Sequence, residues 1–420
     1  MRVLLCTLPQ KTHFLTMAPL AWALRTAGHE VRVASLPQFA STITQAGLTA
    51  APVGREVDID RLDTAETREE FRRGLPGPYR IVEEPGQVDW ADLIDEYEGM
   101  VTWGFKLYNM PLIHDLVAMA RQWQPDLVLW EPFTYAGPIA AKACGAPHGR
   151  LLFTMDVFGV AHEIGRQHDL SLPEEERNDP LVDFLGSFGA RHGFEFSEDM
   201  ISGQFTIDQL PESLSIKATG LDYVPMQYVP YGGPAVVPKW LWTPPEKPRV
   251  ALTMGISATE HFAGYTFNVK DILEALSDVD VEVVATVDPA EQPKLGTVPG
   301  NVRVVDYVPL HALAPTCTAV INHGGFGTLS TIALHGVPQL VLPFHFEGPL
   351  LARKLAAQGA GLALHSDQAS GEAVREALEY LLAEPSFETR AGALREEIRS
   401  LPTPNEVAGQ LEQLAEKYRP

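Results

Sequence analysis

A glycine-rich stretch late in the chain carries the clearest sign of binding chemistry. Residues 322–331 read Asn-His-Gly-Gly-Phe-Gly-Thr-Leu-Ser-Thr, after an apolar run at 318–321 and before a helix-like run at 332–335. A strand, a glycine-rich turn and a helix in this order direct backbone N–H groups and the positive end of a helix at one point. We therefore predict an anion site, most typically for phosphate, with His323 as an added donor at the end of the strand.

The length, composition and net charge of the chain limit the classes of function. The chain has 420 residues, 45% of them apolar, and a formal net charge of −22. These values indicate a globular protein of two or three domains. The acidic balance disfavours nucleic acids and anionic membranes as partners, because no excess of cations is left to meet phosphates. No Gly-x-x-x-x-Gly-Lys run is present, which excludes a P-loop.

The cysteines and the N-terminus bear on the compartment. Cys6, Cys144 and Cys317 form no Cys-x-x-Cys zinc pattern, and we expect three buried thiols in a reducing compartment. No uncharged apolar run approaches the ~20 residues that span a bilayer. The apolar run at the N-terminus stops at Pro9 and is too short for a signal peptide, so we predict a cytoplasmic protein.

Alternating strand-like and helix-like runs predict two parallel sheets. Residues 2–8 form a nearly continuous apolar strand, a loop with His13 follows, and a helix with Pro19 in its first turn leads to a strand at 29–34. The alternation restarts with a strand at 249–254. We therefore predict an α/β protein of two doubly wound, Rossmann-like domains. Neither half carries Gly-x-Gly-x-x-Gly directly after its first strand, which weakens a dehydrogenase interpretation.

Composition shifts place the domain borders. The densest run of proline and glycine, residues 225–248, is the predicted linker between domains at 1–224 and 249–400. We expect residues 401–420 to form a final helix that packs back on the first domain.

Two long polar stretches interrupt the first domain. A compact βαβ unit needs neither residues 55–110 nor residues 160–205. We interpret them as insertions that shape a pocket or meet a partner.

Stretches spread over the chain together resemble one family. They are His13 with residues 19–24, residues 27–31, 323–328 and 336–339, supported by residues 203–214, 228–234 and 252–257. The family is that of the inverting glycosyltransferases of family 1, which have two facing Rossmann-like domains, the GT-B fold. Within it, the chain looks most like the macrolide and polyketide deoxysugar transferases of the desosaminyltransferase type. The resemblance covers both domains and the linker.

The resemblance implies a set of substrates and partners. It implies a dTDP-deoxysugar donor on the C-terminal domain and a hydrophobic aglycone on the N-terminal domain, with no metal and no cofactor besides the donor substrate. Some members of this branch need a helper protein that resembles a cytochrome P450. A homodimer is compatible with the sequence.

His13 is the predicted base. Transfer to a hydroxyl requires a group that takes its proton, and histidine titrates near neutrality. His13 follows the first strand, at the edge where open α/β sheets bind ligands, and the resemblance places the catalytic histidine here. We expect Glu131, at the carboxyl end of a strand that starts at Asp126, to orient it. Many relatives carry Asp near this place. The alternatives are a surface histidine and a partly exposed strand-end carboxylate, and we assign Asp126 to the opposite edge.

The donor site is predicted from the glycine-rich stretch and the resemblance. We expect the diphosphate to contact His323, Gly324, Gly325, Gly327 and Thr328, with Gly255 and Ser257 opposite, and the nucleobase to contact Tyr307 and Val308. The alternatives are a tight turn without a ligand, a helix cap for Ser257 and plain packing for Tyr307.

Glu347 and Gly348 stand where common family members have an Asp-Gln pair that binds sugar hydroxyls. The change keeps an acceptor and loses an amide, and Phe344 and Phe346 add apolar surface. Because an unmet buried polar group is costly, this composition suits a sugar that lacks hydroxyls. On the acceptor side, we expect aromatic residues to line the cleft, and packing in the core is their alternative role. They are Trp103, Phe133, Tyr135 and Phe153.

These predictions combine into a metal-independent, inverting transfer of a deoxysugar to a hydroxyl of a polyketide or macrolide aglycone in antibiotic biosynthesis. His13, oriented by Glu131, takes the proton, and the glycine-rich stretch receives the departing diphosphate. Two alternatives share the architecture: a sugar-nucleotide epimerase and a non-catalytic partner of another transferase.

Overall fold

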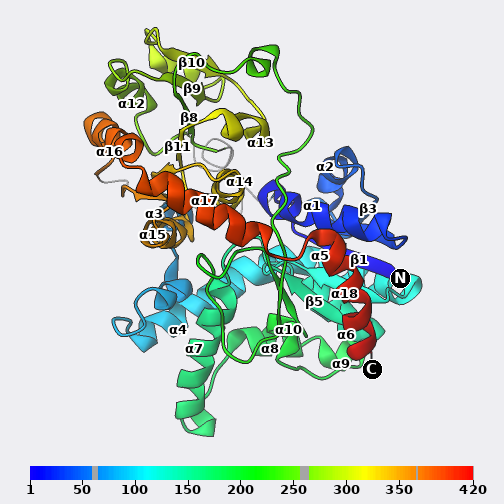
Figure 1. Ribbon diagram of the computed structural model, residues 1–420. Helices are drawn as coiled ribbons and strands as arrows, with labels where there is room; N and C mark the ends of the chain where they lie inside the picture. Colours follow the sequence, from blue (N-terminus) through cyan, green and yellow to red (C-terminus); the bar gives the residue numbers. More distant parts are fainter. Residues whose placement is uncertain (59–64, 256–263, 366–367, 420) are drawn as a thin grey trace.

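Each half of the chain folds around a parallel β-sheet (Figure 1). The computed structural model describes residues 1–58, 65–255, 264–365 and 368–419, so Ser257 lies outside the described residues. The first sheet has the order β3 (Ala50–Pro52), β2 (Glu30–Ser35), β1 (Arg2–Cys6), β4 (Leu127–Trp130), β5 (His148–Leu151), β6 (Thr206–Asp208) and β7 (Tyr223–Pro225). The second has the order β10 (Val302–Val305), β9 (Glu282–Thr286), β8 (Arg249–Thr253), β11 (Ala319–Asn322), β12 (Gln339–Val341) and β13 (Gly361–Ala363).

Helices connect the strands of both sheets. In the N-terminal half the α-helices are α1 (Lys11–Thr26), α2 (Ala40–Gln45), α3 (Ala65–Arg73), α4 (Trp90–Gly99), α5 (Lys106–Trp123), α6 (Ala136–Cys144), α7 (Val157–Ser171), α8 (Pro180–Gly186), α9 (Gly189–His192) and α10 (Asp199–Ser202). In the C-terminal half they are α12 (Val269–Ala275), α13 (Leu310–Leu313), α14 (Phe326–Leu334), α15 (Gly348–Gln358), α16 (Gly371–Ala383), α17 (Ser386–Arg399) and α18 (Pro404–Lys417). Short 3₁₀ turns include η1 (Pro37–Phe39), η3 (Gly77–Val82), η5 (Glu174–Glu176), η6 (Lys239–Trp242), η7 (Gln292–Leu295) and η8 (Ala314–Thr316), and η4 (Met100–Phe105) is a π-helical turn.

Both faces of the first sheet are buried. Along β1, Val3 and Leu5 belong to one apolar cluster, and Leu4 and Cys6 belong to another. Successive side chains of a strand point to opposite faces, so a nearly continuous apolar run can bury both. The expected architecture of two doubly wound domains is confirmed.

The first helix differs from the prediction. Pro19 lies inside α1, which begins at Lys11, so His13 is on the first turn of this helix and not in a loop. A proline in a helix interior removes one backbone hydrogen bond. Leu20 and Leu24 of the same helix are fully buried, and this packing offsets the loss.

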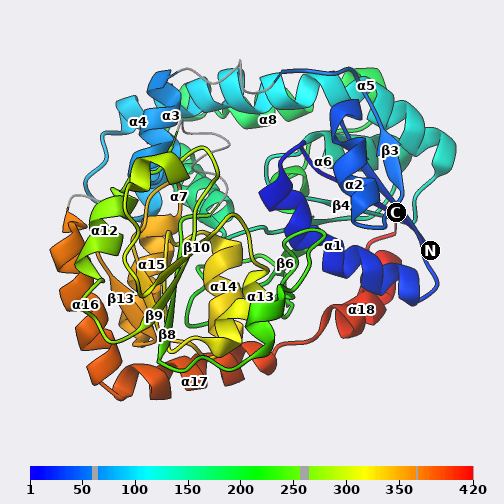
Figure 2. The same cartoon turned by 90° about the horizontal axis from the view of Figure 1, so that it is seen from above.

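The last helix returns to the N-terminal domain. In Figures 1 and 2, α17 runs along the C-terminal domain and α18 lies beside α1. Val407 and Leu411 of α18 are buried in the apolar cluster of α1, and Glu412 lies 3.2 Å from the ring of His29. The chain passes between the domains twice, first after β7 and again before α18. The backbone N–H of Gln227 in the first connection donates to the carbonyl of Pro402 in the second at 2.7 Å.

The N-terminal insertion reaches the C-terminal domain. The backbone N–H groups of His345 and Phe346 donate to the carbonyls of Arg72 and Phe71, each at 2.9 Å. His345 and Phe346 have φ angles of 71° and 47°, a backbone conformation that is strained for residues other than glycine. The hydrogen bonds to the insertion therefore support a strained loop directly after β12.

Candidate functional site

A cavity of about 490 Å³ lies between the two domains. Leu8, Phe133 and Phe153 line it from the N-terminal domain, each just after a strand. Gly255 and His323 line it in the same way from the C-terminal domain. The carboxyl edges of both sheets therefore meet at one cavity, which is where open α/β sheets bind their ligands.

Most of the predicted site residues meet in this cavity. Those that line it are His13, Phe133, Phe153, Gly255, Tyr307, Val308, His323, Gly325, Gly327, Thr328 and Glu347. Glu131 is buried behind His13, and Gly324 and Gly348 are buried behind the glycine-rich turn. Asp126 lies at the other end of β4, as expected, where it accepts a hydrogen bond of 2.6 Å from the backbone of Arg2.

His13 and Glu131 form a close pair. His13 Nδ1 lies 3.3 Å from Glu131 Oε2, and the Glu131 side chain is fully buried. Glu131 also accepts hydrogen bonds from the backbone N–H groups of Leu8 and Phe133 and from the hydroxyl of Thr134. Burial favours the neutral acid, but His13 and these donors outweigh it, so the pKa of Glu131 is below its usual value. An ionised carboxylate thus faces Nδ1 and leaves Nε2 for an acceptor hydroxyl.

Aromatic rings hold the imidazole of His13. The ring of Phe153 stacks on it with a centroid distance of 3.6 Å and an angle of 11°, and Phe133 lies 5.8 Å away. The His13 side chain is 15% exposed. Phe346 extends the aromatic wall of the cavity, with 6.4 Å between its centroid and that of Phe133, and the buried Phe158 packs against both rings. The base is therefore fixed in orientation and lies beside an apolar surface.

The glycine-rich turn presents the N-terminus of α14. Gly325 precedes this helix, and no side chain of the described residues caps it. The backbone N–H of Leu329 is the one that bonds back to Gly325, at 2.9 Å. The N–H groups of the first turn, at Phe326, Gly327 and Thr328, precede that bond and are available to an anion.

The ring of His323 fits between two glycines. A Cβ added at Gly255 would lie 2.4 Å from its Cε1, and one added at Gly325 would lie 2.4 Å from its Nε2. Burial lowers the pKa of His323 to about 4. The imidazole is therefore neutral near pH 7 and can offer a hydrogen bond to an anion without a full charge.

Glu347 lines the cavity and contacts the other domain. The hydroxyl of Thr154 donates to Glu347 Oε1 at 2.5 Å. Burial raises the pKa of Glu347, although Thr154 and His13 act in the opposite direction. Glu347 and His13 line the same cavity, so the carboxylate predicted to meet the sugar shares this space with the predicted base.

Two predicted acceptor contacts lie elsewhere. Trp103 is 71% exposed and is not among the residues that line the cavity. Tyr135 is buried, packs edge-on against Phe105 with 4.8 Å between centroids, and lines a second cavity of about 100 Å³ in the N-terminal domain. Both predictions rest on an aromatic residue near a strand end or in an insertion, a pattern that does not tell which way a side chain points.

Two residues of the site were missed. Thr154 directly follows the strand at 148–151, and its position at the carboxyl edge was a usable signal. Tyr228, whose hydroxyl donates to the carbonyl of Gly327 at 3.3 Å, comes from the region between the domains. No local pattern marks a contact between residues so distant in sequence.

Comparisons with known proteins show the family of the chain. Residues 22–255 match the family model of the erythromycin biosynthesis protein CIII-like N-terminal domain, and residues 270–414 match that of the C-terminal domain. The chain belongs to the erythromycin biosynthesis protein CIII-like family. Proteins similar to this chain include 10-deoxymethynolide desosaminyltransferase of Streptomyces venezuelae, which is 44% identical over 425 residues, with 100% of this chain and 98% of that protein covered. Tylactone mycaminosyltransferase of Streptomyces fradiae is 42% identical, with 100% and 93% covered.

Solved structures show the same architecture. The crystal structure of the glycosyltransferase VinC in complex with dTDP superimposes with a TM-score of 0.89 at 38% identity and covers 99% of this chain and 100% of its own. The spinosyn forosaminyltransferase SpnP has a TM-score of 0.83 at 38% identity, with 99% of both chains covered. For this CIII-like protein the predicted GT-B fold is confirmed. The predicted class of enzyme, a glycosyltransferase that moves deoxysugars in polyketide antibiotic biosynthesis, is confirmed at the level of the family, and neither an epimerase nor a non-catalytic partner is favoured.

Proposed function

We propose that this chain transfers a deoxysugar from a dTDP-sugar to a hydroxyl of a macrolide or polyketide aglycone, with inversion at the anomeric carbon. One observation carries the proposal. A single cavity combines the His13–Glu131 pair of the N-terminal domain with the uncapped N-terminus of α14 from the C-terminal domain. The first can deprotonate an acceptor, and the second can receive an anionic leaving group.

The proposed reaction is a single displacement. His13 Nε2 takes the proton of the acceptor hydroxyl while Glu131 stabilises the imidazolium that forms. The acceptor oxygen bonds to the anomeric carbon, and the bond from that carbon to the phosphate oxygen breaks with its electron pair. The diphosphate then carries an added negative charge, which the N–H groups of Gly327 and Thr328 and the ring of His323 stabilise.

The donor assignment rests on the charge and shape of the cavity. Among the described residues that line it there is no Lys or Arg, so the diphosphate meets backbone dipoles and neutral imidazole. The related structure of VinC was solved with dTDP. We place the nucleobase at Tyr307, which is 51% exposed, and the buried Val308, and the sugar at Glu347.

The acceptor assignment rests on the aromatic wall. Phe133 and Phe153 flank His13, and Phe346 continues the surface. Such a surface suits an apolar aglycone whose hydroxyl points to the base. We keep Phe133 and Phe153 as acceptor contacts and leave out Trp103 and Tyr135, which lie away from this cavity.

The proposed compartment rests on the cysteines. The three cysteines are unpaired, as is usual in a reducing compartment, and we propose action in the cytoplasm on this ground. Across the described ranges, no helix is long and apolar enough to cross a membrane. The same part of the chain has no cluster of three or more His, Cys, Asp or Glu side chains arranged to hold a metal ion.

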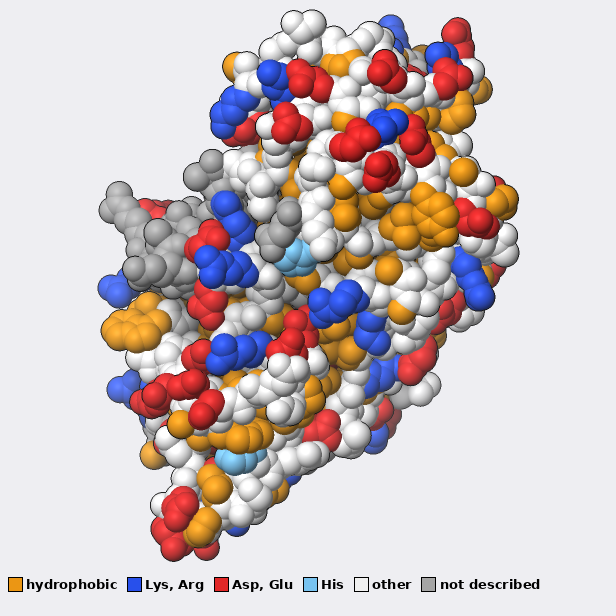
Figure 3. Space-filling model, turned by 90° about the vertical axis from the view of Figure 1, so that its left-hand side faces the viewer, with side chains coloured by type: hydrophobic (Ala, Val, Ile, Leu, Met, Phe, Trp, Pro, Cys, Tyr) orange, Lys and Arg blue, Asp and Glu red, His pale blue; other side chains and the backbone are white. Residues whose placement is uncertain are grey.

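The proposed partners are substrates. On the face shown in Figure 3, Lys and Arg side chains are interspersed with Asp and Glu side chains and do not form one broad basic area. The helper protein and the homodimer stay predictions.

The test is a donor panel with the purified protein. We expect glycoside formation, followed by mass spectrometry, to be faster with dTDP-deoxysugars than with a UDP-hexose when a macrolide aglycone is present. The configuration of the new bond, read by NMR, should be opposite to that of the donor. Incubation with the donor alone tests for epimerisation. Calorimetry that detects no affinity for dTDP or a dTDP-sugar would refute the proposal.

A further inference from the structure

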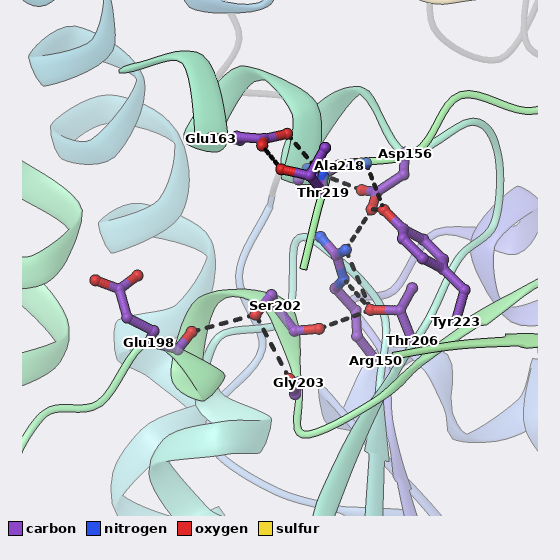
Figure 4. A network of polar contacts seen from close by, with 11 residues as sticks. Arg150, Asp156, Glu163, Glu198, Ser202, Gly203, Thr206, Ala218, Thr219 and Tyr223 are labelled. Carbon is purple, nitrogen blue, oxygen red and sulfur yellow. Dashed lines mark hydrogen bonds and ion pairs between the residues drawn. The ribbon is translucent and has the colours of Figure 1, made fainter. Parts of the chain in front are cut away.

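The loop between β5 and α7 is anchored at its far end by a buried ion pair (Figure 4). Arg150 Nη2 lies 2.5 Å from Asp156 Oδ2, and both side chains are buried. The hydroxyl of Tyr223 donates to the same carboxylate oxygen at 2.6 Å. The other oxygen of Asp156 accepts from the backbone N–H of Gly159 at 2.8 Å and so caps α7. Asp156 is thus held from three directions, and the end of the loop is fixed.

The near end of the same loop is anchored to β6. The backbone N–H of Leu152 donates to the carbonyl of Ile207 at 3.0 Å, and the Gln209 amide donates to the carbonyl of Leu152 at 2.8 Å. Between the two anchors lie Phe153, Thr154 and Met155, all of them buried. A short segment held at both ends has little freedom, so its side chains keep one direction.

Two neighbouring residues of this segment reach the two halves of the site. Phe153 stacks face to face on the ring of His13. Thr154 donates a hydrogen bond of 2.5 Å to Glu347 across the boundary between the domains. Among the described residues, Thr154 is the hydrogen-bond partner found for the buried Glu347 side chain, and Glu347 lines the cavity.

We propose that Thr154 is a positioning residue that sets the donor-sugar carboxylate and links it to closure of the domains. By holding Oε1 of Glu347, the hydroxyl leaves Oε2 directed at the sugar. The two residues belong to different domains, so the contact exists only while the domains are together. In that arrangement one anchored loop fixes both the base, through Phe153, and the sugar-binding carboxylate, through Thr154. This inference rests on the function proposed above.

The contact should matter for the sugar and not for the nucleotide. A hydrogen bond to a charged group contributes about 1.5–3 kcal/mol, which corresponds to roughly ten- to hundredfold in affinity. The residues proposed to bind the diphosphate and base lie on the glycine-rich turn and after β10, whereas the side-chain hydrogen bond of Thr154 goes to Glu347. A loss of the hydroxyl should therefore weaken a dTDP-sugar and leave dTDP unchanged.

The experiment compares Thr154→Val with Thr154→Ser. Valine keeps the shape and removes the donor, and serine keeps the donor. Calorimetry with dTDP and with a dTDP-deoxysugar, both without acceptor, gives two affinities for each protein. We expect Thr154→Val to lose about ten- to hundredfold for the dTDP-sugar with dTDP affinity within about twofold of the wild type, and Thr154→Ser to recover the sugar affinity to within about threefold.

Three results would overturn the inference. They are wild-type dTDP-sugar affinity in Thr154→Val, an equal loss for dTDP and dTDP-sugar, and failure of serine to restore binding. The second and third would mean that the substitution acts on the loop as a whole. These outcomes differ from failure of the proposed function, which would appear as an absence of dTDP-sugar affinity in the wild type itself.

Discussion

Replacing Glu131 with glutamine tests the catalytic pair most directly. The substitution keeps the shape of the side chain and removes its charge 3.3 Å from His13 Nδ1. The carboxamide oxygen can still accept from the backbone of Leu8 or Phe133, so the strand end keeps hydrogen bonds. The change therefore acts mainly on the charge that faces the imidazole.

The magnitude follows from the distance and the burial. At an effective dielectric constant of about 20, two unit charges 3.3 Å apart attract by about 5 kcal/mol. His13 is 15% exposed, so water weakens this attraction, and the neutral side chain no longer carries the cost of a buried charge. About 3–4 kcal/mol of transition-state stabilisation should be lost, which lowers kcat by roughly two to three orders of magnitude. Donor affinity should be unchanged, because Glu131 does not line the donor side.

The assay is turnover at saturating dTDP-deoxysugar and aglycone, with dTDP affinity measured by calorimetry. Glu412→Gln is a matched control, because Glu412 lies 3.2 Å from His29 on α18 and away from the cavity. It should keep wild-type turnover. A Glu131→Gln protein with turnover within threefold of the wild type would refute the role of the pair, as would a parallel loss of donor affinity.

Three further predictions concern the same cavity. His13→Ala should lower kcat by about two to four orders of magnitude with dTDP affinity little changed, and wild-type turnover would remove His13 from the mechanism. Gly325→Ala should weaken dTDP binding in calorimetry by at least tenfold, because its Cβ would lie 2.4 Å from His323 Nε2; Gly300→Ala, whose Cβ meets nothing within 4 Å, should bind normally. The low pKa of His323 means that the unfolded chain takes up a proton below about pH 6.5 while the folded chain does so only near pH 4. Unfolding in urea at pH 7 and pH 5 should therefore show the wild type losing about 2 kcal/mol more than His323→Asn, and equal losses would contradict a buried neutral ring.

Residues at the ends of parallel strands could be placed from the sequence. His323 and Glu131 each follow a short apolar run, and parallel strands bring such ends to one edge of a sheet. The prediction for α1 was wrong because the rule that proline favours the first turn gave the wrong start, while tertiary packing tolerates Pro19 in the interior.

Contacts across the domain boundary could not be predicted from the sequence. Thr154 and Glu347 are 193 residues apart, and no sequence pattern around either residue indicates the contact. The loop in which His345 and Phe346 have positive φ angles donates hydrogen bonds to the carbonyls of Arg72 and Phe71, acceptors that only the folded insertion supplies. Trp103 and Tyr135 show the same limit, because neither a place in an insertion nor a place after a strand tells whether an aromatic side chain faces solvent, core or cavity.

The hydrogen bond between Gln227 and Pro402 ties together the two polypeptide connections that run between the domains. Two covalent crossings at one point act as a pivot, so relative movement is confined largely to rotation about it. Separation is then smallest beside the pivot and greatest at the distant rim, where Arg353 pairs with Glu83 and the insertion meets His345. Because the Arg353–Glu83 pair at that rim is partly exposed, the ionic strength of the solvent should influence how readily the two domains part there.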